Sequence, residues 1–335
     1  MSPPIEVCDA PAIPGLTFRH FHGEEDFPSM VCVIEGSKKE DQLEFSLSVE
    51  DIANEFNNLY NFDPFADMLF VEMDGEVIGY AEVWWEDLEE TWVCPHAAYL
   101  LPEWRGKGIR RAMLKYNERR AREIALNHPT DKPCFFQAWS VETEAHWQSL
   151  LISEQYRPVR YGVHMVRSLS DPIPDLLLPE GIDVHPVQPE EYWTIWKAAC
   201  ESLRELWQGL RFRDEMFKQW MGDSTFNPGL WVVAWDTDNK VAGTVLNFID
   251  EAENREYNFK RGHVEFVTVA QAHRGKGLAK ALIARSFNVL KDEGMTEAFL
   301  GVDVKNTSGA LHLYKRMGFN PVKHRTTYQK SMDTR

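Results

Sequence analysis

The segment VEFVTVAQAHRGKGLAKAL, residues 264–282, changes its pattern twice. Val264–Val269 is rich in apolar and β-branched residues, which predicts a buried strand. After the turn Ala270–His273, apolar residues recur at helical spacing from Leu278 onwards, and Gly294 is placed to end the helix. A glycine-rich turn between a strand and a helix directs free backbone N–H groups and the helix dipole at one point, so the segment predicts an anion-binding site.

A glycine-rich turn that only caps a helix is the simpler interpretation of this loop, because G-x-G often occurs by chance. Two other phosphate-binding loops are excluded. The sequence has no G-x-x-x-x-G-K-[ST] motif, and no G-x-G-x-x-G motif with a following acidic residue. The surroundings of the loop therefore have to decide between an anion site and a plain helix cap.

The spacing Arg274-x-x-Gly277-x-Ala279 after a strand resembles the acetyl-coenzyme A loop of the GNAT acetyltransferase superfamily. A second segment, NTSGALHLYKRMGF at residues 306–319, resembles the signature N-x-x-A-x-x-x-Y-x-x-x-G-F of that superfamily within one residue. The resemblance implies an α/β (mixed α+β) fold, in which a twisted mixed sheet splays apart at its central strands to admit the pantetheine arm. It also implies acetyl-CoA as co-substrate, with no metal.

The composition is typical of a soluble globular protein, with 335 residues of which 44% are hydrophobic and 26% charged. No apolar run approaches the roughly 18 residues of a membrane span. The start, MSPPIEVCDAPAIPG, has neither the basic nor the apolar region of a signal peptide. The five cysteines are scattered without a C-x-x-C pair, which favours reduced thiols and a cytoplasmic location over a metal framework.

The net charge of −16 argues against a nucleic-acid partner, because binding phosphates requires a basic face. The same charge favours the approach of a cationic acceptor such as an amine. We therefore expect a small-molecule or peptide amine as the partner, and neither nucleic acid nor a membrane.

The chain contains a repeat. Residues 103–114 align with residues 272–283 without a gap, and residues 140–159 align with residues 303–322. This self-similarity predicts two copies of one mixed α/β unit of roughly 160 residues. The segment SLSDPIPDLLLPEG, residues 168–181, is the expected boundary, because its three prolines prevent regular structure.

The repeat leads to an expected domain order. Residues 1–172 are predicted to form an N-terminal degenerate GNAT domain, residues 173–181 a linker and residues 182–335 a C-terminal catalytic GNAT domain. This layout resembles that of the mycothiol synthases, which are tandem members of the superfamily. Two GNAT units commonly pair, so we expect an intrachain pseudo-dimer that is a monomer or weak dimer in solution.

The second copy keeps residues that the first copy lacks. Ala279, where the loop must approach a pyrophosphate, aligns with Arg110, which would either obstruct that approach or bind the phosphate. The other exchanged positions, second copy named first, are Glu265 and His96, Asn306 and Thr143, Tyr314 and Leu151, and Gly318 and Gln155. We therefore expect the chemistry in the second half, and a first half that is catalytically silent but needed for stability.

The resemblance makes Glu265 the expected general base, acting through water on an amine that is mostly protonated at neutral pH. The alternative for Glu265 is a salt-bridged strand residue, and His263 is the second candidate base. Tyr314 is the expected general acid, because a phenol with a pKa near 10 can donate to a leaving thiolate and the superfamily uses a tyrosine here. The alternative for Tyr314 is a core residue of its helix.

The resemblance also assigns the cofactor contacts. Backbone groups of Val267 and Val269 would hold the pantetheine by extending the strand ladder, and Asn306 would contact the same arm. The loop residues expected to hold the pyrophosphate are Arg274, Gly275, Lys276, Gly277, Leu278 and Ala279.

Two further segments have weaker patterns. Trp207 and Phe212 are candidates for a wall of the acceptor pocket, although core packing is the preferred interpretation of the tryptophan-rich start of the second copy. The acidic run Asp250–Glu256 is interpreted as a solvated hairpin tip.

Three functions compete. The first is an N-acetyltransferase that transfers the acetyl group of acetyl-CoA to a primary amine by direct attack. The second is a catalytically inactive acyl-CoA-binding sensor or scaffold protein. The third is a tandem-fold aminoacyl transferase that uses charged tRNA, which the acidic charge and the retained Arg-Gly-Lys-Gly loops disfavour. The sequence does not identify the acceptor amine.

Overall fold

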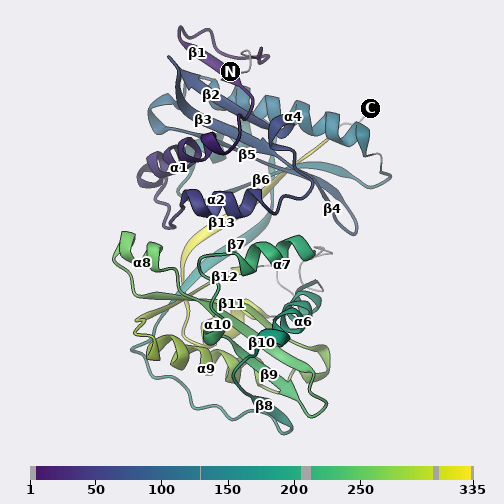
Figure 1. Cartoon of the computed structure of the whole chain (residues 1–335), viewed down its shortest axis with the longest axis vertical. Coiled ribbons are helices and arrows are strands. Elements are labelled where there is room, and N and C mark those ends of the chain that lie inside the picture. The colour runs from purple at the N-terminus through teal and green to yellow at the C-terminus, as the bar shows by residue number, and fades with distance from the viewer. Residues whose placement is uncertain (1–4, 129, 205–212, 305–308, 333–335) are drawn as a thin grey trace. The chain divides into compact units, whose positions relative to one another are not determined.

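The chain forms two compact units in this computed structural model, which describes residues 5–128, 130–204, 213–304 and 309–332 (Figure 1). Unit 1 comprises Met1–Arg160 together with Arg325–Arg335, and unit 2 comprises Tyr161–His324. Each unit is a mixed sheet with helices on its faces, in agreement with the α/β (mixed α+β) fold expected from the sequence.

The sheet of unit 1 is mixed. In spatial order its strands are β1 (Leu16–Arg19), β2 (Met68–Met73), β3 (Glu76–Val83), β5 (Trp92–Leu100), β6 (Cys134–Val141) and the second part of β13 (Asn320–Ser331). Neighbours are antiparallel except β5 and β6, which are parallel. A short strand, β4 (Glu86–Asp87), pairs with β5. The helices of the unit are α1 (Phe27–Asp41), α2 (Val49–Phe56), α3 (Pro64–Asp67), α4 (Ile109–Asn127) and α5 (Ala145–Ser153).

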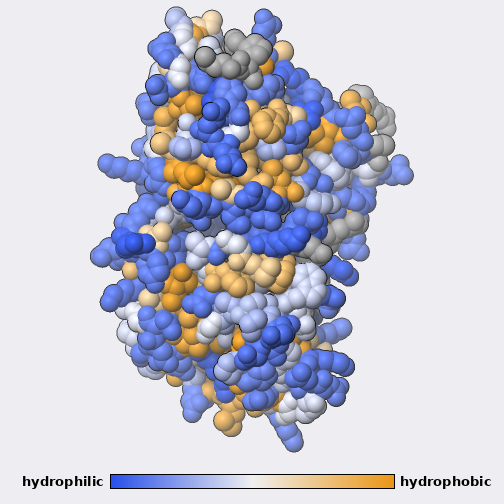
Figure 2. Space-filling model, viewed as in Figure 1, coloured by the Kyte–Doolittle hydropathy of each residue, from blue (hydrophilic) through white to orange (hydrophobic). Residues whose placement is uncertain are grey.

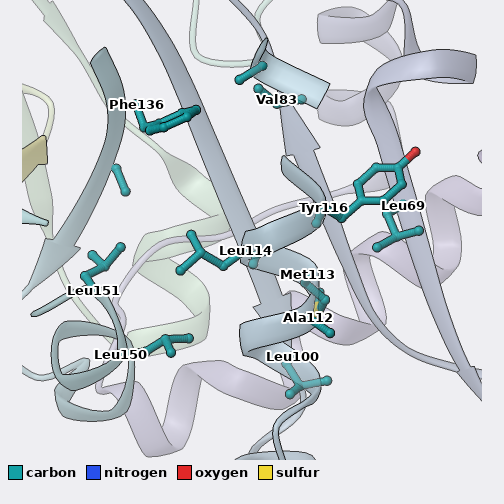
Figure 3. Packing of buried hydrophobic residues seen from close by; sticks show 14 of the residues in the cluster. Leu69, Val83, Leu100, Ala112, Met113, Leu114, Tyr116, Phe136, Leu150 and Leu151 are labelled. Atoms are coloured by element: carbon teal, nitrogen blue, oxygen red, sulfur yellow. The ribbon is translucent and has the colours of Figure 1, made fainter. Parts of the chain in front are cut away.

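Both faces of the unit 1 sheet are buried. Along β2, Leu69 and Val71 join the core beneath α4, whereas Met68 and Phe70 join the core beneath α1 and α2. Alternate residues of a strand point to opposite faces, so α4 covers one face and α1 with α2 the other. Figure 3 shows the α4 side, where side chains of the helix pack among residues of the strands and α5. Burying each large apolar side chain contributes about 1.5–3 kcal/mol.

Unit 2 has the same plan. In spatial order its strands are β7 (Arg157–Ser168), β12 (Glu297–Asp303), β11 (Arg261–Val269), β10 (Val241–Phe248), β9 (Val232–Asp236) and β8 (Ile182–Val184). Its helices are α6 (Tyr192–Arg204), α7 (Asp214–Met221), α8 (Glu251–Tyr257), α9 (Leu278–Asp292) and α10 (Ala310–Arg316). One core lies beneath α9 and α10, and an aromatic core lies beneath α6 and α7.

Each unit takes one edge strand from the part of the sequence that was predicted to belong to the other domain. β7 pairs with β12 from Gly162 to Ser168, and β13 pairs with β6 from Arg325 to Ser331. The compact units therefore differ from the predicted division into residues 1–172, 173–181 and 182–335. That division describes the repeat in the sequence and stays a prediction. The predicted linker has no helix or strand, but Ile173, Leu176 and Leu178 pack against the core of unit 2.

The central strands of unit 2 separate as expected. β11 pairs with β12 in parallel only from Arg261 to His263, and the structure describes no pairing between them further along. β11 also contains a bulge. On β10, Thr244 and Leu246 are two positions apart, whereas their partners on β11, Thr268 and Glu265, are three positions apart. The extra residue is accommodated at Phe266, which has a φ of 45°.

Hydrophilic residues dominate the face drawn in Figure 2, with smaller hydrophobic patches between them. No helix in the described part of the chain combines the length and apolar character needed to cross a membrane.

Candidate active site

The loop between β11 and α9 presents open backbone at the start of a helix. Gly275 and Gly277 have φ of 76° and 84°, and a Cβ atom at either position would meet no atom within 4 Å. Such left-handed backbone suits glycine, and the open space in front of it allows a ligand to approach the N–H groups of the first helical turn. The predicted loop Arg274–Ala279 therefore has the geometry of an anion-binding site.

The side chains of this loop have different roles. Arg274 Nε donates a hydrogen bond to the carbonyl oxygen of Val269 at 2.9 Å, which ties the loop to the end of its strand. Lys276 is exposed, whereas Leu278 is buried and anchors the start of α9 in the core. Leu278 can therefore contribute only its backbone N–H to a phosphate.

For the strand before the loop, the described residues include no strand partner on its β12 side beyond His263. Because β11 separates from β12 after His263, backbone groups of Val267 and its neighbours on that edge are left to bind a ligand as an added strand. On the other edge, Val269 pairs with Gly243 of β10. The pantetheine contacts predicted for Val267 and Val269 stay a prediction, to which this geometry is suited.

Glu265 is close enough to Tyr314 to affect the ionisation of its phenol. Burial raises the pKa of Glu265 to about 7, and the positive charge of His263 opposes the rise. Tyr314 is 7% exposed, and burial raises the pKa of its phenol, to which the negative charge of Glu265 adds. The site thus holds a carboxyl group whose pKa lies near neutral pH and a phenol that keeps its proton there.

His263, the second candidate base, is held inside the unit. Its Nε2 lies 3.2 Å from Oε2 of Glu253, and its ring stacks on Phe248 with centroids 4.3 Å apart. Glu253 belongs to α8, in the acidic run that was interpreted as a solvated hairpin tip. That interpretation is wrong. Asp250 Oδ1 accepts hydrogen bonds from the N–H groups of Ala252 and Glu253, and this N-cap starts a helix that buries Glu253.

A pocket of about 200 Å³ lies beside the loop. The last turns of α6 form one wall, and β10, β11 and the loop form the others, with Glu201, Gly243, Thr268 and Arg274 among the lining residues. Around the bulge, the aromatic core packs Trp196 against Phe266 with centroids 5.5 Å apart. Trp196, Trp231 and Trp235 are buried, in keeping with their interpretation as core residues, whereas Trp193 is 40% exposed.

The corresponding loop of unit 1 is occupied by side chains of the same unit. Arg105 repeats the contact of Arg274, donating to the carbonyl oxygen of Leu100 at 3.2 Å. Its two Nη atoms also bind the carboxylate of Asp41 at 2.7 and 2.6 Å. The N–H of Gly106 donates to Nε2 of His146 at 3.2 Å. A carboxylate and an imidazole therefore take the contacts that a phosphate would need.

The strand edge of unit 1 is occupied as well. Arg110 is buried, and its Nε donates to the carbonyl oxygen of Ala98 at 2.7 Å while its guanidinium lies 4.4 Å from the ring centroid of Trp147. Burial lowers the pKa of Arg110 to about 10. Asn117 Nδ2 donates to the carbonyl oxygens of Ala97 on β5 and Glu82 on β3, at 2.8 and 3.1 Å, which ties α4 to both strands. Of the two interpretations of Arg110, this geometry favours obstruction.

The strand register changes which residue of unit 1 corresponds to Glu265 of unit 2. β3 and β5 pair without a bulge, with Glu82 opposite Ala97 and Val83 opposite His96. Glu265 lies opposite Leu246 of β10, and the residue opposite the equivalent position of β3, Glu82, is Ala97. Ala97 and not His96 therefore occupies the place of Glu265. The difference arises because a bulge shifts the register by one residue, which an ungapped alignment cannot include. His96 Nε2 lies 2.8 Å from the Tyr156 hydroxyl, and burial lowers the pKa of His96 to about 3, so the ring stays neutral.

Three candidate residues, Asn306, Trp207 and Phe212, lie outside the described residues. Within the described residues, no group of three or more His, Cys, Asp or Glu side chains is placed to hold a metal ion. The residues that sequence reasoning missed are Phe266 and Glu253. No local signal marked the bulge at Phe266, whereas Asp250 ahead of Glu253 was a readable N-cap.

Known families match both units. Residues 192–319 match the model of the Acetyltransferase (GNAT) family, and residues 65–144 match a second model, described as an Acetyltransferase (GNAT) domain. Together the two matches cover more than half of the chain. The mycothiol acetyltransferase of Salinispora arenicola is 27% identical over 237 residues, covering 69% of this chain and 71% of that protein. The mycothiol acetyltransferase of Pseudarthrobacter chlorophenolicus is 28% identical over 187 residues, so the match spans little more than half of each protein, 55% of this chain and 56% of the other.

Solved structures share the fold along nearly the whole chain. A GCN5-related N-acetyltransferase from Sphaerobacter thermophilus superposes with a TM-score of 0.69 at 23% identity, covering 96% of both chains. A tandem GNAT protein from the clavulanic acid biosynthesis pathway superposes with a TM-score of 0.66 at 16% identity, covering 95% of this chain and 98% of that one. At these identities the likeness concerns the fold alone.

Proposed function

The chain belongs to the GNAT family of acetyltransferases, and from that premise we propose that it is an N-acetyltransferase whose chemistry takes place in unit 2. In this proposal it transfers the acetyl group of acetyl-CoA to a primary amine by direct attack. The observation that carries the proposal is a contrast between the units. Among the described residues, no atom fills the space beside Gly275 and Gly277, and no strand pairs with β11 on its β12 side beyond His263. The loop and strand edge of unit 1 are closed by Asp41, His146 and Arg110.

The residues of unit 2 suit each step of this reaction. The N–H groups at the start of α9 would hold the pyrophosphate, and the free edge of β11 would hold the pantetheine. Glu265, with a pKa of about 7, would accept a proton from the ammonium form of the acceptor through water. The neutral nitrogen then attacks the carbonyl carbon as the bond to sulfur breaks, and Tyr314 donates a proton to the leaving sulfur. The nitrogen loses a second proton as the amide forms, which balances the one given to sulfur.

A thiol-release assay tests the proposal. Acetyl-CoA is supplied with a panel of primary amines, including sugar amines, polyamines and peptides, and free thiol is measured with and without each amine. Amine-dependent release of thiol supports the proposal. Tight binding of acetyl-CoA without release for any amine would instead support the catalytically inactive sensor or scaffold protein.

Tyr314→Phe should lower kcat by roughly tenfold or more, since general acid help is typically worth about 10²–10⁴. The substitution removes the phenolic proton and keeps the ring, whose centroid lies 5.9 Å from that of Phe319. The dissociation constant of acetyl-CoA should therefore stay near the wild-type value. Steady-state kinetics and calorimetry measure the two quantities. An unchanged kcat would make Tyr314 a core residue only.

Acetyl-CoA should bind once per chain. Because unit 1 already satisfies its loop and strand edge, Gly108→Asp should leave both the stoichiometry and kcat essentially unchanged. Gly108 has a φ of 87°, so Gly108→Ala serves as the control for backbone strain. Arg105→Ala is less suitable as a test of unit 1, because it would leave the buried carboxylate of Asp41 unpaired and so destabilise the unit. A calorimetric stoichiometry of two, or loss of activity in a folded Gly108→Asp protein, would contradict this assignment.

A further inference from the structure

Helix α8 is joined to the first residue of the catalytic strand. Asn254 Nδ2 donates to the carbonyl oxygen of Arg261 at 2.9 Å, and the N–H of Arg261 donates to Asn254 Oδ1 at 2.9 Å. This reciprocal pair fixes the helix against β11. In unit 1 the corresponding connection between β3 and β5 contains the short strand β4 and no helix. The feature is therefore specific to the unit that we assign to the chemistry.

Helix α8 carries a buried carboxylate, that of Glu253. Glu253 is 5% exposed, with Oε1 lying 3.3 Å from Nη1 of Arg261 and Oε2 lying 3.2 Å from Nε2 of His263. Burial alone would raise the pKa of Glu253, but the contacts with His263 and Arg261 outweigh it and the pKa is lowered. Glu253 is thus held as a carboxylate beside the imidazole of His263.

The imidazole is also fixed in orientation. Its ring is parallel to that of Phe248 within 9°, and its centroid lies 5.0 Å from that of Phe299. The strand register is continuous from His263 to Glu265, so the two side chains lie on the same face of β11.

We propose that Glu253 and His263 form a positioning pair for the base Glu265, in which the buried carboxylate of α8 holds the imidazole of His263 beside the catalytic carboxylate, so that a proton on the imidazole favours the ionised form of that base. This inference rests on the proposed function of unit 2. His263 is a positioning residue here, because it acts through Glu265 and need not touch the amine.

Other charged and titratable groups face this pair in the described part of the chain. From β12, Glu297 lies 3.6 Å from Arg261, and from α10 Tyr314 interacts with Glu265. From β7, the ring of His164 contacts Phe299, with centroids 5.2 Å apart. Phe299 lies between His164 and His263. Of the groups that act on Glu265, His263 is the one whose charge opposes the effect of burial.

The sign of the expected pH effect follows from that opposition. Burial favours the protonated form of Glu265, and the positive charge of His263 favours the ionised form. Removing the charge should raise the pKa of Glu265 above its value of about 7. The acidic limb of kcat/KM, which rises as the base loses its proton, should then move to higher pH.

The test uses His263→Asn and Glu253→Gln in the full chain, with Glu251→Gln on the exposed side of α8 as the matched control. A rise of about one pKa unit would lower kcat/KM roughly tenfold near pH 6 and leave it almost unchanged near pH 9. The control should follow the wild-type profile, and the KM for acetyl-CoA should stay constant in all three variants. A pH-independent loss in both site variants, or no change in either, would overturn the proposal.

A second measurement does not depend on activity. Carbon-13 NMR of protein labelled in its glutamate carboxyl groups follows the titration of Glu265, with the resonance identified by its absence in Glu265→Gln. The midpoint should rise in Glu253→Gln and in His263→Asn. If these midpoints rise but no amine is acetylated, the proposed function fails and the positioning pair stands. If amines are acetylated and the midpoints do not move, only the positioning pair fails.

Discussion

Gly277→Asp should weaken the binding of acetyl-CoA by about 100-fold or more, which corresponds to about 2.7 kcal/mol. Gly277 is the N-cap of α9, and a side chain there would enter the open space in front of the first helical turn. A carboxylate at this point would be attracted by the helix dipole and would repel a pyrophosphate at the same N–H groups. Calorimetry with acetyl-CoA measures the change.

Two control variants separate charge from strain. Gly277→Ala adds a Cβ atom at the same φ of 84° without a charge, and it should cost about 1–2 kcal/mol of backbone strain. Gly108→Asp places the same charge in the loop of unit 1 and should leave the affinity near that of the wild type. Equal affinity in Gly277→Asp and the wild-type protein would show that the pyrophosphate lies elsewhere. Equal losses in Gly277→Asp and Gly277→Ala would attribute the effect to the backbone.

A fragment of residues 173–335 should fail to fold, whereas a fragment of residues 161–335 should unfold cooperatively. The difference between the fragments includes β7 from Tyr161 onward, which pairs with β12 through seven residue pairs. It also includes Val163, Met165 and Leu169, which are 3%, 0% and 1% exposed in the core of unit 2. Each contributes about 1.5–3 kcal/mol of burial energy, and the sum is comparable with the 5–15 kcal/mol that stabilises a whole domain.

Soluble yield and urea denaturation of the two fragments measure this effect. The fragment that starts at residue 173 should be insoluble, or should lose its signal without a cooperative transition. A soluble, cooperatively folded fragment of residues 173–335 would mean that β12 does not need β7 as its neighbour. The comparison therefore tests the structural units against the repeat boundary that was predicted from the sequence.

The two units share a loop motif but differ in what surrounds it. Arg105 and Arg274 make the same hydrogen bond to the last carbonyl of their strands. That contact stabilises the strand–turn–helix connection whether or not a ligand is present. Binding depends instead on whether neighbouring side chains leave the N–H groups free. In unit 1, Asp41 and His146 reach the loop from α1 and α5 and occupy it.

The sequence by itself was sufficient to predict the repeat, the GNAT family, the strand–loop–helix segment and the separation of the central strands. The repeat and the strand–loop–helix segment follow from self-similarity, local backbone preferences and periodicity, which can be read along the chain. The family came from its two motifs, and the separation of the central strands was implied by the resemblance to that family. Gly275 and Gly277 have the positive φ that such a turn requires. The roles assigned to Glu265, Tyr314 and the loop residues came from the same motifs and stay predictions.

Only the tertiary structure decided the membership of β7 and β13, the contacts of Arg110, the raised pKa of Glu265 and the burial of Glu253. Each of these depends on residues that are distant in the sequence. An arginine near a loop can bind a phosphate or a carbonyl oxygen, and the choice depends on which strand lies opposite. An acidic side chain is solvated or buried according to whether a cation from another element meets it, because an unpaired charge is too costly to bury.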